Sequence, residues 1–232
     1  MTKYINSILF SILFIVCSQW HTAAAFSWDL TPAEQAAFSA ISSKNRAGLR
    51  QSLIKLAQQE PTSYMLYPFG SSFYLYDQEF TDEIVQTLKN YLKIHPNDIQ
   101  VNCTVGCILL DNSLPPKDAL YAKEERWYHE IPPDKSLPTT LHREAVLSGM
   151  AYLEHAFNYA NNTTMKELVF LTTRNLLRGY SVLDENDKGM ATVTQAQARF
   201  PGIDPMCLLY YQAKFLKKKS QLDQAYTILK KH

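Results

Sequence analysis

The sequence lacks several features that common enzymes require. It has only 7 glycines in 232 residues, and it holds neither a glycine-rich phosphate-binding loop nor a Gly-x-Ser-x-Gly turn for an activated serine. The His-Glu-x-x-His spacing of zinc proteases is absent, and no stretch alternates between apolar and polar residues for long enough to predict a sheet. These absences argue against phosphate-loop enzymes, α/β-hydrolases, zinc proteases and sheet-rich folds. We therefore expect no catalytic residue, no metal and no cofactor.

An excess of charge is missing as well. Lysine and arginine number 23 against 22 aspartates and glutamates, which gives a formal charge of +1. A balanced chain offers no electrostatic reason to expect nucleic acid as a partner. The one basic run, Lys217 to Lys219, is predicted at a helix end, where cations meet the helix dipole favourably and stay solvated. The hydrophobic fraction of 46% and the 14 tyrosines predict a globular chain of helices packed through aromatic side chains.

The first 25 residues have the form of a secretory signal peptide. Lys3 supplies a positive start, Ile8 to Val16 is an apolar stretch too short to span a membrane, and Ala23 to Ala25 are small residues suited to cleavage. We therefore expect a mature chain that begins at Phe26, forms one domain over residues 26–232, and acts in the periplasm or outside the cell. No later segment reaches the ~18 apolar residues of a membrane span. A lipoprotein attached at Cys17 and a retained N-terminal anchor remain alternatives.

The segment from Met206 to Leu229 reads as two amphipathic helices joined by a tight turn. Counted from Met206, bulky residues stand at positions 4, 11 and 24 and alanines at positions 8 and 20; they are Leu209, Leu216, Leu229, Ala213 and Ala225. The pattern resembles one tetratricopeptide repeat, a 34-residue unit. Small residues are needed at positions 8 and 20 because the paired helices touch closely there. Gln212 departs from the pattern, since position 7 of that family favours leucine.

The spacing of prolines indicates further units. Proline commonly ends the second helix of such a unit because it cannot continue the helical hydrogen bonds. Four prolines lie 35, 36 and 69 residues apart, which is close to one, one and two units: Pro61, Pro96, Pro132 and Pro201. This regular spacing of prolines, in a chain without strand signals, predicts an all-α fold. The predicted architecture is a right-handed α-α solenoid of about five tetratricopeptide-like helix pairs.

The same register places small residues in two other units. A first helix is predicted to begin at Ile99, with Gly106 at position 8. A shift of the C-terminal register by 34 residues places Gly179 at position 8 and Ala191 at position 20 of another unit.

Local signals complete the prediction of the helices. Thr31 and Glu34 have the spacing of a capping box at the start of a helix. Helices are predicted over Thr31–Ser42, Lys44–Gln59, Phe80–Pro96, Lys117–Glu130 and Thr140–Tyr159, the fourth of them within a proline-rich insertion.

Three cysteines follow the leader: Cys103, Cys107 and Cys207. An odd number in an exported protein predicts at least one free thiol or an intermolecular bridge. Cys103 and Cys107 lie about one helical turn apart, where their Cβ directions suit a disulfide poorly. Because no third or fourth ligand has metal-site spacing, buried free thiols are favoured over a bridge or a metal pair.

The resemblance also implies a function. Tetratricopeptide arrays bind peptides or partner helices in a concave groove lined by their first helices. The groove positions of the family fall on Phe69, Phe73, Tyr76, Cys103, Cys107, Asp111, Tyr180, Tyr210, Lys214 and Lys217. We therefore expect an exported, non-catalytic interaction or scaffold module with a protein or peptide partner. For each aromatic residue in this set, a place in the core between repeats is an equally good interpretation.

Two other functions remain open. A secreted helical enzyme or effector would be favoured by serine, histidine and acidic residues gathered in one concave pocket. An adaptor in assembly or secretion machinery would use the same helical array. Tyr226 and Leu229 lie in the last predicted helix, and we expect this helix to contact a partner or a second copy of the chain.

Overall fold

The structure is a computed structural model, and it describes residues 30–43, 45–67, 70, 78–114, 142–218, 221 and 224. Within these ranges the elements are helical and no strand occurs, so the predicted all-α class is confirmed. None of the described helices is long and apolar enough to cross a membrane. The helices are α2 (Pro32–Ser42), α3 (Arg46–Gln59), α5 (Gln78–Leu92), α6 (Ile99–Ser113), α7 (Arg143–Tyr159), α8 (Lys166–Leu183), α9 (Asn186–Arg199) and α10 (Pro205–Lys218).

Several predictions fall outside the described residues and stay predictions. They are the signal peptide over residues 1–25, the helix over Lys117–Glu130, the groove residues Phe69, Phe73 and Tyr76, and the second helix of the C-terminal motif with Ala225, Tyr226 and Leu229.

Local hydrogen bonds set where the helices begin. The Glu34 N–H donates to Thr31 Oγ1 (3.2 Å) and the Thr31 N–H donates to Glu34 Oε2 (3.1 Å), which is the capping box predicted for α2. Helix α6 begins at Ile99 as predicted, after Asp98, whose carboxylate accepts a backbone N–H three residues on at 2.9 Å. Helix α3 begins slightly later than predicted because Asn45 caps it.

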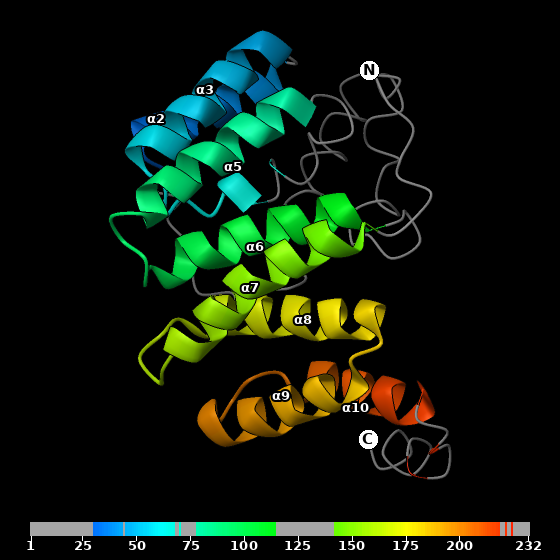
Figure 1. Ribbon diagram of the computed structural model, residues 1–232. Helices are drawn as coiled ribbons and strands as arrows, with labels where there is room; N and C mark the ends of the chain where they lie inside the picture. Colours follow the sequence, from blue (N-terminus) through cyan, green and yellow to red (C-terminus); the bar gives the residue numbers. More distant parts are fainter. Residues whose placement is uncertain are drawn as a thin grey trace, which may run out of the picture.

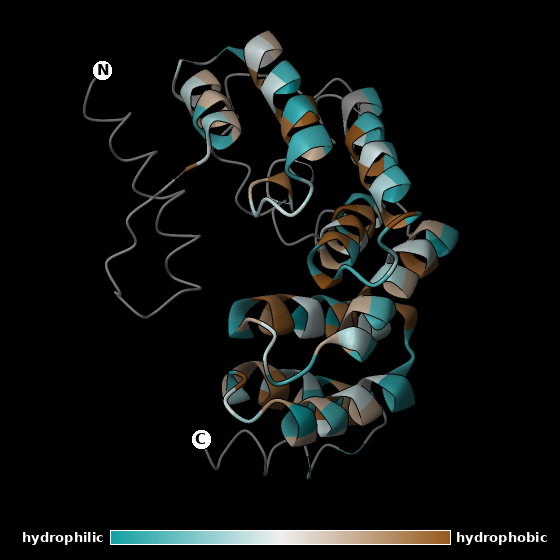
Figure 2. Cartoon of the chain, turned by 90° about the vertical axis from the view of Figure 1, so that its left-hand side faces the viewer, coloured by the Kyte–Doolittle hydropathy of each residue, from teal (hydrophilic) through white to brown (hydrophobic). Residues whose placement is uncertain are grey.

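The helices pack in the order in which they follow one another along the chain. Each contacts the next, and α8 contacts both α6 and α10, so these three helices form one row. Figure 1 shows the stack running from α2 at one end to α10 at the other. One continuous core of buried apolar side chains joins all of these helices. Figure 2 shows hydrophobic residues concentrated in the middle of the molecule, where α6 lies.

Two glycines bring α6 and α7 unusually close together. A Cβ added at Gly106 would lie 2.9 Å from the Gly149 carbonyl oxygen and 2.7 Å from Leu153 Cγ. A Cβ added at Gly149 would lie 3.0 Å from the Gly106 carbonyl oxygen. Backbone atoms lie on both sides of this contact and cannot move aside, so the contact requires glycine on both helices. Gly106 therefore has the close-contact role that its register position predicts.

At the other unit the register holds for one of its two small residues. Gly179 lies closely under the Met150 side chain of α7, whereas Ala191 is exposed. The glycine that α10 covers is Gly189, which lies under the Phe215 ring. The predicted role of Ala191 was therefore wrong, and the close contact lies two residues earlier in α9.

Helix α6 is enclosed on all sides, because none of its residues is classed as exposed. The segment that follows α3 covers one of these sides. Leu66 and Tyr67 are buried in the core, and a Cβ at Gly70 would collide with the Ile108 side chain of α6. Thr81 Oγ1 donates to the Gly70 carbonyl oxygen at 3.3 Å and fastens this segment to α5. Helix α8 is likewise unexposed beyond its first turn, as far as Leu183.

Candidate functional site

The groove residues predicted on α6 lie in the core. Cys103 and Cys107 are fully buried, and Asp111 is nearly so. The prediction that these three side chains line an open groove was therefore wrong. The reason is the segment that covers α6: the Tyr67 hydroxyl reaches Asp111 and donates to its Oδ2 at 3.1 Å.

A buried polar cluster forms around Asp111. Its carboxylate is paired with the guanidinium of Arg178 in α8, and both side chains are almost fully enclosed. Arg178 Nη1 also donates to Asn175 Oδ1 at 3.0 Å. Burial by itself would lower the pKa of Arg178. The negative charge of Asp111 outweighs this effect, so the net pKa of Arg178 lies above its ordinary value. Arg178 therefore stays charged, and the cluster joins α6 to α8.

The thiols of the chain are poorly placed for reaction, because they are buried or half-buried. Cys103 and Cys107 are free, with sulfur atoms 3.8 Å apart, which confirms the interpretation as buried thiols. Burial, followed by the neighbouring Cys103, raises the pKa of Cys107 well above its usual value. Burial also raises the pKa of the half-buried Cys207 to about 11. Protonated thiols are poor nucleophiles and poor metal ligands. No group of three possible ligands occurs among the described residues.

Tyr180 also lies in the core, so it shares no surface with Tyr210. Its exposed fraction is 6%, and its hydroxyl donates to Glu154 Oε1 of α7 at 2.8 Å. Burial, helped by Glu154, raises the pKa of Tyr180 above its ordinary value. The alternative interpretation, a core tyrosine between helix pairs, is the one that the structure supports here.

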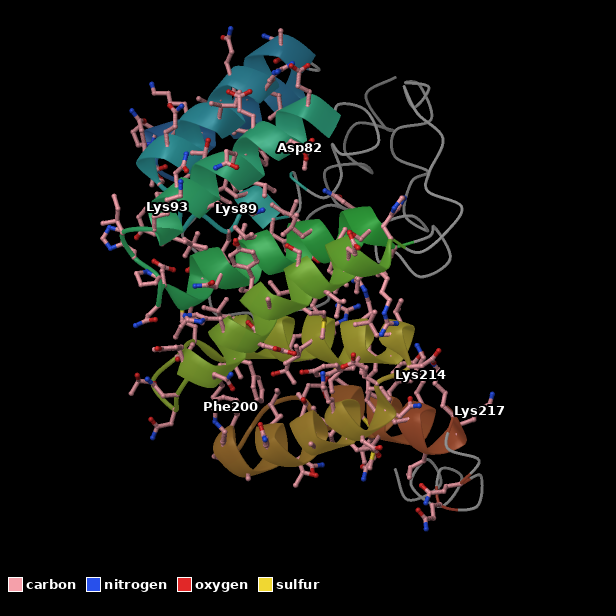
Figure 3. The ribbon with its side chains drawn as sticks, viewed as in Figure 1. Asp82, Lys89, Lys93, Phe200, Lys214 and Lys217 are labelled. Carbon is pink, nitrogen blue, oxygen red and sulfur yellow. The ribbon has the colours of Figure 1, made fainter. Side chains whose placement is uncertain are left out.

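The predicted residues on α10 remain accessible. Tyr210 is 56% exposed, Lys217 is exposed and Lys214 is half-buried. Met206, which the sequence argument did not select, is 58% exposed and precedes Tyr210 by one turn. Positions 206, 210, 214 and 217 follow the spacing of one helix face. Figure 3 shows Lys214 and Lys217 together at the end of the molecule that α10 forms.

Aromatic and cationic groups adjoin on this face. The Tyr210 and Tyr211 rings meet edge to face with centroids 5.2 Å apart, and Lys214 Nζ lies 5.8 Å from the centre of the Tyr211 ring. Burial raises the pKa of Tyr211 to about 12, although the positive charges of Arg178 and Arg174 in α8 act to lower it. The α10 sequence contains three lysines and no acidic residue. We call the face formed by Met206, Tyr210, Lys214 and Lys217 the α10 surface.

Lys218 differs from its neighbour in the basic run. Its ammonium group donates to Asp184 Oδ1 at 2.5 Å and also to the Ser181 carbonyl oxygen. The lysine thereby fastens the end of α10 to the end of α8, where Asp184 has the left-handed backbone of a helix C-cap (φ 59°). The predicted solvated helix end therefore applies to Lys217 and not to Lys218.

A hollow of about 570 Å³ lies at the other end of the stack, between α2, the end of α3 and α5. Its described lining is Thr31, Glu34, Gln59, Glu60, Pro61, Thr62, Ser63, Tyr64 and Tyr91. Serine and glutamate are thus present, but no histidine is found among these lining residues. The cluster that would favour a secreted enzyme is therefore incomplete in this hollow.

No protein-family model matches the chain, and no curated protein or solved structure matches it significantly.

Proposed function

We propose that the chain is an exported, non-catalytic interaction module, an α-α solenoid of tetratricopeptide-like helix pairs. The row formed by α6, α8 and α10 supports this, because first helices of successive pairs contact one another in such an array. Helices α7 and α9 are then second helices. Ile99 and Met206, predicted as first positions of their units, lie in the first turns of α6 and α10.

The α10 surface is the proposed binding site, and one observation carries this. Met206 and Tyr210 are large apolar side chains that stay exposed on the same helix face as two lysines. Tyrosine pairs an apolar ring with a hydrogen-bonding tip and is frequent among the residues that dominate binding energy. The first helices α6 and α8 are enclosed, so α10 is the member of this row that presents groove positions to a partner.

The positive charge of the α10 surface favours a partner segment of negative charge. Lys214 and Lys217 lie on the same helix as the tyrosines, and the α10 sequence contains no acidic residue. An acidic peptide segment that carries an aromatic or aliphatic side chain fits both features, because its carboxylates meet the lysines and its apolar group packs on Tyr210. We therefore propose such a segment of another protein as the partner.

A selection from a random dodecapeptide display library tests the proposal. We expect the wild-type protein to enrich acidic peptides with an aromatic residue. Tyr210→Ala and Lys217→Glu should each weaken the Kd of a recovered peptide about tenfold, which is ~1.4 kcal/mol. Binding should also weaken as salt is added, because the lysines are near the surface.

Two variants serve as matched controls. Tyr159→Ala removes an exposed tyrosine of α7, and Lys55→Glu reverses an exposed charge of α3. Both should leave the Kd unchanged within about twofold. Equal losses in the control variants, or a selection without acidic peptides, would contradict an acidic partner on the α10 surface.

Export is tested separately. The leader of residues 1–25 has the positive start, short apolar stretch and small residues of a cleavable signal peptide. We expect N-terminal sequencing of the periplasmic or secreted protein to begin at Phe26. A full-length protein that stays in the cytoplasm would remove the export proposal and leave the binding proposal standing.

A further inference from the structure

The hollow at the α2 end of the molecule has a distinct chemical character. Its lining includes two carboxylates, Glu34 and Glu60, and no lysine, arginine or histidine occurs among the described lining residues. It also includes the tyrosines Tyr64 and Tyr91. An open hollow lined by carboxylates and aromatic side chains is complementary to a cation that carries apolar groups.

The Glu34 carboxylate is held in place by two hydrogen bonds. Its Oε2 accepts from the Thr31 N–H at 3.1 Å, and its Oε1 accepts from Ser63 Oγ at 2.7 Å. Each carboxylate oxygen can accept a further hydrogen bond, so these contacts orient the group without using its full capacity. A carboxylate oriented before binding costs less entropy when a cationic donor arrives.

The two tyrosines are held as well. The Tyr91 hydroxyl donates to Asp98 Oδ2 at 3.2 Å, and the Tyr64 hydroxyl lies 3.1 Å from Met165 Sδ. Both contacts fix the hydroxyl end of a side chain that lines the hollow. Burial, followed by the negative charge of Glu167, raises the pKa of Tyr64 above its ordinary value.

We propose that this hollow binds an organic cation, with an alkylammonium or guanidinium group between the Glu34 and Glu60 carboxylates and the Tyr64 and Tyr91 rings. Carboxylates give charge-assisted hydrogen bonds, and the ring faces attract the same positive charge. The volume is many times that of one water molecule, so it holds a chain of several methylene groups along with the charge.

Two sources can supply this chemistry, a free polyamine or amino acid and a lysine or arginine side chain of a peptide. The hollow is lined from α2, the end of α3 and α5, and Figure 1 shows these helices away from α10, so binding of the cation does not depend on the α10 proposal. Figure 3 labels Lys214 and Lys217 beside α10. A bare metal ion fits less well, because no group of three metal ligands occurs in the described part of the chain.

Titration of the ¹⁵N-labelled full chain with spermidine, followed by NMR, tests the proposal. We expect saturable shifts of the backbone signals from Thr62 to Tyr64 and of Tyr91. Parallel titrations with the blocked tripeptides Gly-Lys-Gly and Gly-Arg-Gly distinguish a peptide side chain from a free amine. The neutral tripeptide Gly-Gln-Gly should give no saturable shift.

The variants are chosen to keep the fold. Glu34→Gln removes the charge but retains the capping hydrogen bonds, because glutamine serves equally well at that position of a capping box. We expect Glu34→Gln and Glu60→Gln each to weaken spermidine binding about tenfold. Tyr91→Phe keeps the ring but loses the hydrogen bond to Asp98 that positions it, so it should bind less tightly than the wild type but more tightly than Tyr91→Leu, which should lose about fivefold.

Glu83→Gln is the matched control, because Glu83 lies on α5 outside the hollow and is only loosely paired with Arg50 at 3.6 Å. It should leave the Kd unchanged. Absence of saturable shifts with every cation, or an unchanged Kd in both Glu34→Gln and Glu60→Gln, would overturn the proposal. Equal shifts with the neutral tripeptide would overturn it as well.

Discussion

Tyr67 donates its phenolic proton to Asp111 across 3.1 Å, and this contact fastens the segment after α3 over α6. Asp111 is at the same time the ion-pair partner of Arg178 in α8. One carboxylate thus holds three parts of the chain together inside the core. The side of α6 that a tetratricopeptide-like groove would leave open is filled here by the chain itself.

The buried pair should be sensitive to the loss of one partner. Asp111→Asn leaves the Arg178 charge enclosed and uncompensated, so we expect the free energy of unfolding to fall by ~3–5 kcal/mol. Tyr67→Phe removes one hydrogen bond and should cost about 1 kcal/mol. Urea denaturation followed by circular dichroism measures both.

The double variant Asp111→Leu/Arg178→Met provides the control, because it removes both charges. It should recover much of the stability that Asp111→Asn loses. A change below about 0.5 kcal/mol in Asp111→Asn would mean that the pair is not enclosed as described.

The glycine contact between α6 and α7 gives a second prediction. A side chain at Gly149 would meet the Gly106 carbonyl oxygen and the Leu110 backbone nitrogen, both at 3.0 Å. We expect Gly149→Leu to lower the free energy of unfolding by ~1–3 kcal/mol or more, because backbone cannot move aside. Ala151→Leu adds one carbon atom less, on the exposed face of α7, and should stay within about 0.5 kcal/mol of the wild type. Similar melting temperatures for the two variants would contradict the close contact.

Local signals in the sequence predicted the helices well. The capping box of Thr31 and Glu34, and the start of α6 at Ile99, depend on residues that are neighbours in the chain. The choice between core and surface depended on residues distant in sequence. Nothing near Asp111 shows that Tyr67 covers it, and nothing near Tyr180 shows that Glu154 of α7 receives its hydroxyl.

One signal of the enclosed helix was present in the sequence. From Val101 to Leu110 every residue is apolar or a small polar one, with no charge. A helix that is apolar on all sides is typical of the interior rather than of a binding groove. By the same criterion α10 remains a candidate for a binding surface, because its lysines and the exposed Tyr210 give it a face toward solvent. The register assigned Cys103 and Tyr210 to equivalent positions, and only packing separated them.

The α10 surface gives a third prediction, about stability. Tyr210 is mostly exposed, so Tyr210→Ala should fold normally, with a free energy of unfolding within about 0.5 kcal/mol of the wild type. Phe215 on the same helix is fully buried against Gly189, so Phe215→Ala should cost ~3–5 kcal/mol. Thermal denaturation of the two variants measures the difference. Unfolding of Tyr210→Ala would show a core tyrosine and would remove the α10 surface as a binding site.

The thiols give the last prediction, on pH dependence. Burial raises the pKa of Cys207 to about 11 from its ordinary value near 9. At pH 8 the thiolate fraction of Cys207 should then be about a hundredfold below that of an unhindered thiol. We expect iodoacetamide to label the native protein at a rate lowered by about this factor, and the rate to rise about tenfold per pH unit up to about pH 11.

The raised pKa of Cys207 also makes the free energy of unfolding depend on pH. Folding favours the protonated thiol, so this contribution to stability is fully present below about pH 9 and is lost as the pH rises through about 11. Cys103 and Cys107 are fully buried and should be labelled only after unfolding. In urea, mass spectrometry should therefore find Cys103, Cys107 and Cys207 all modified, whereas under native conditions Cys207 should react first. Rapid labelling of Cys103 or Cys107 in the native protein at pH 8 would show that α6 is accessible, and it would reopen the groove that the structure closes.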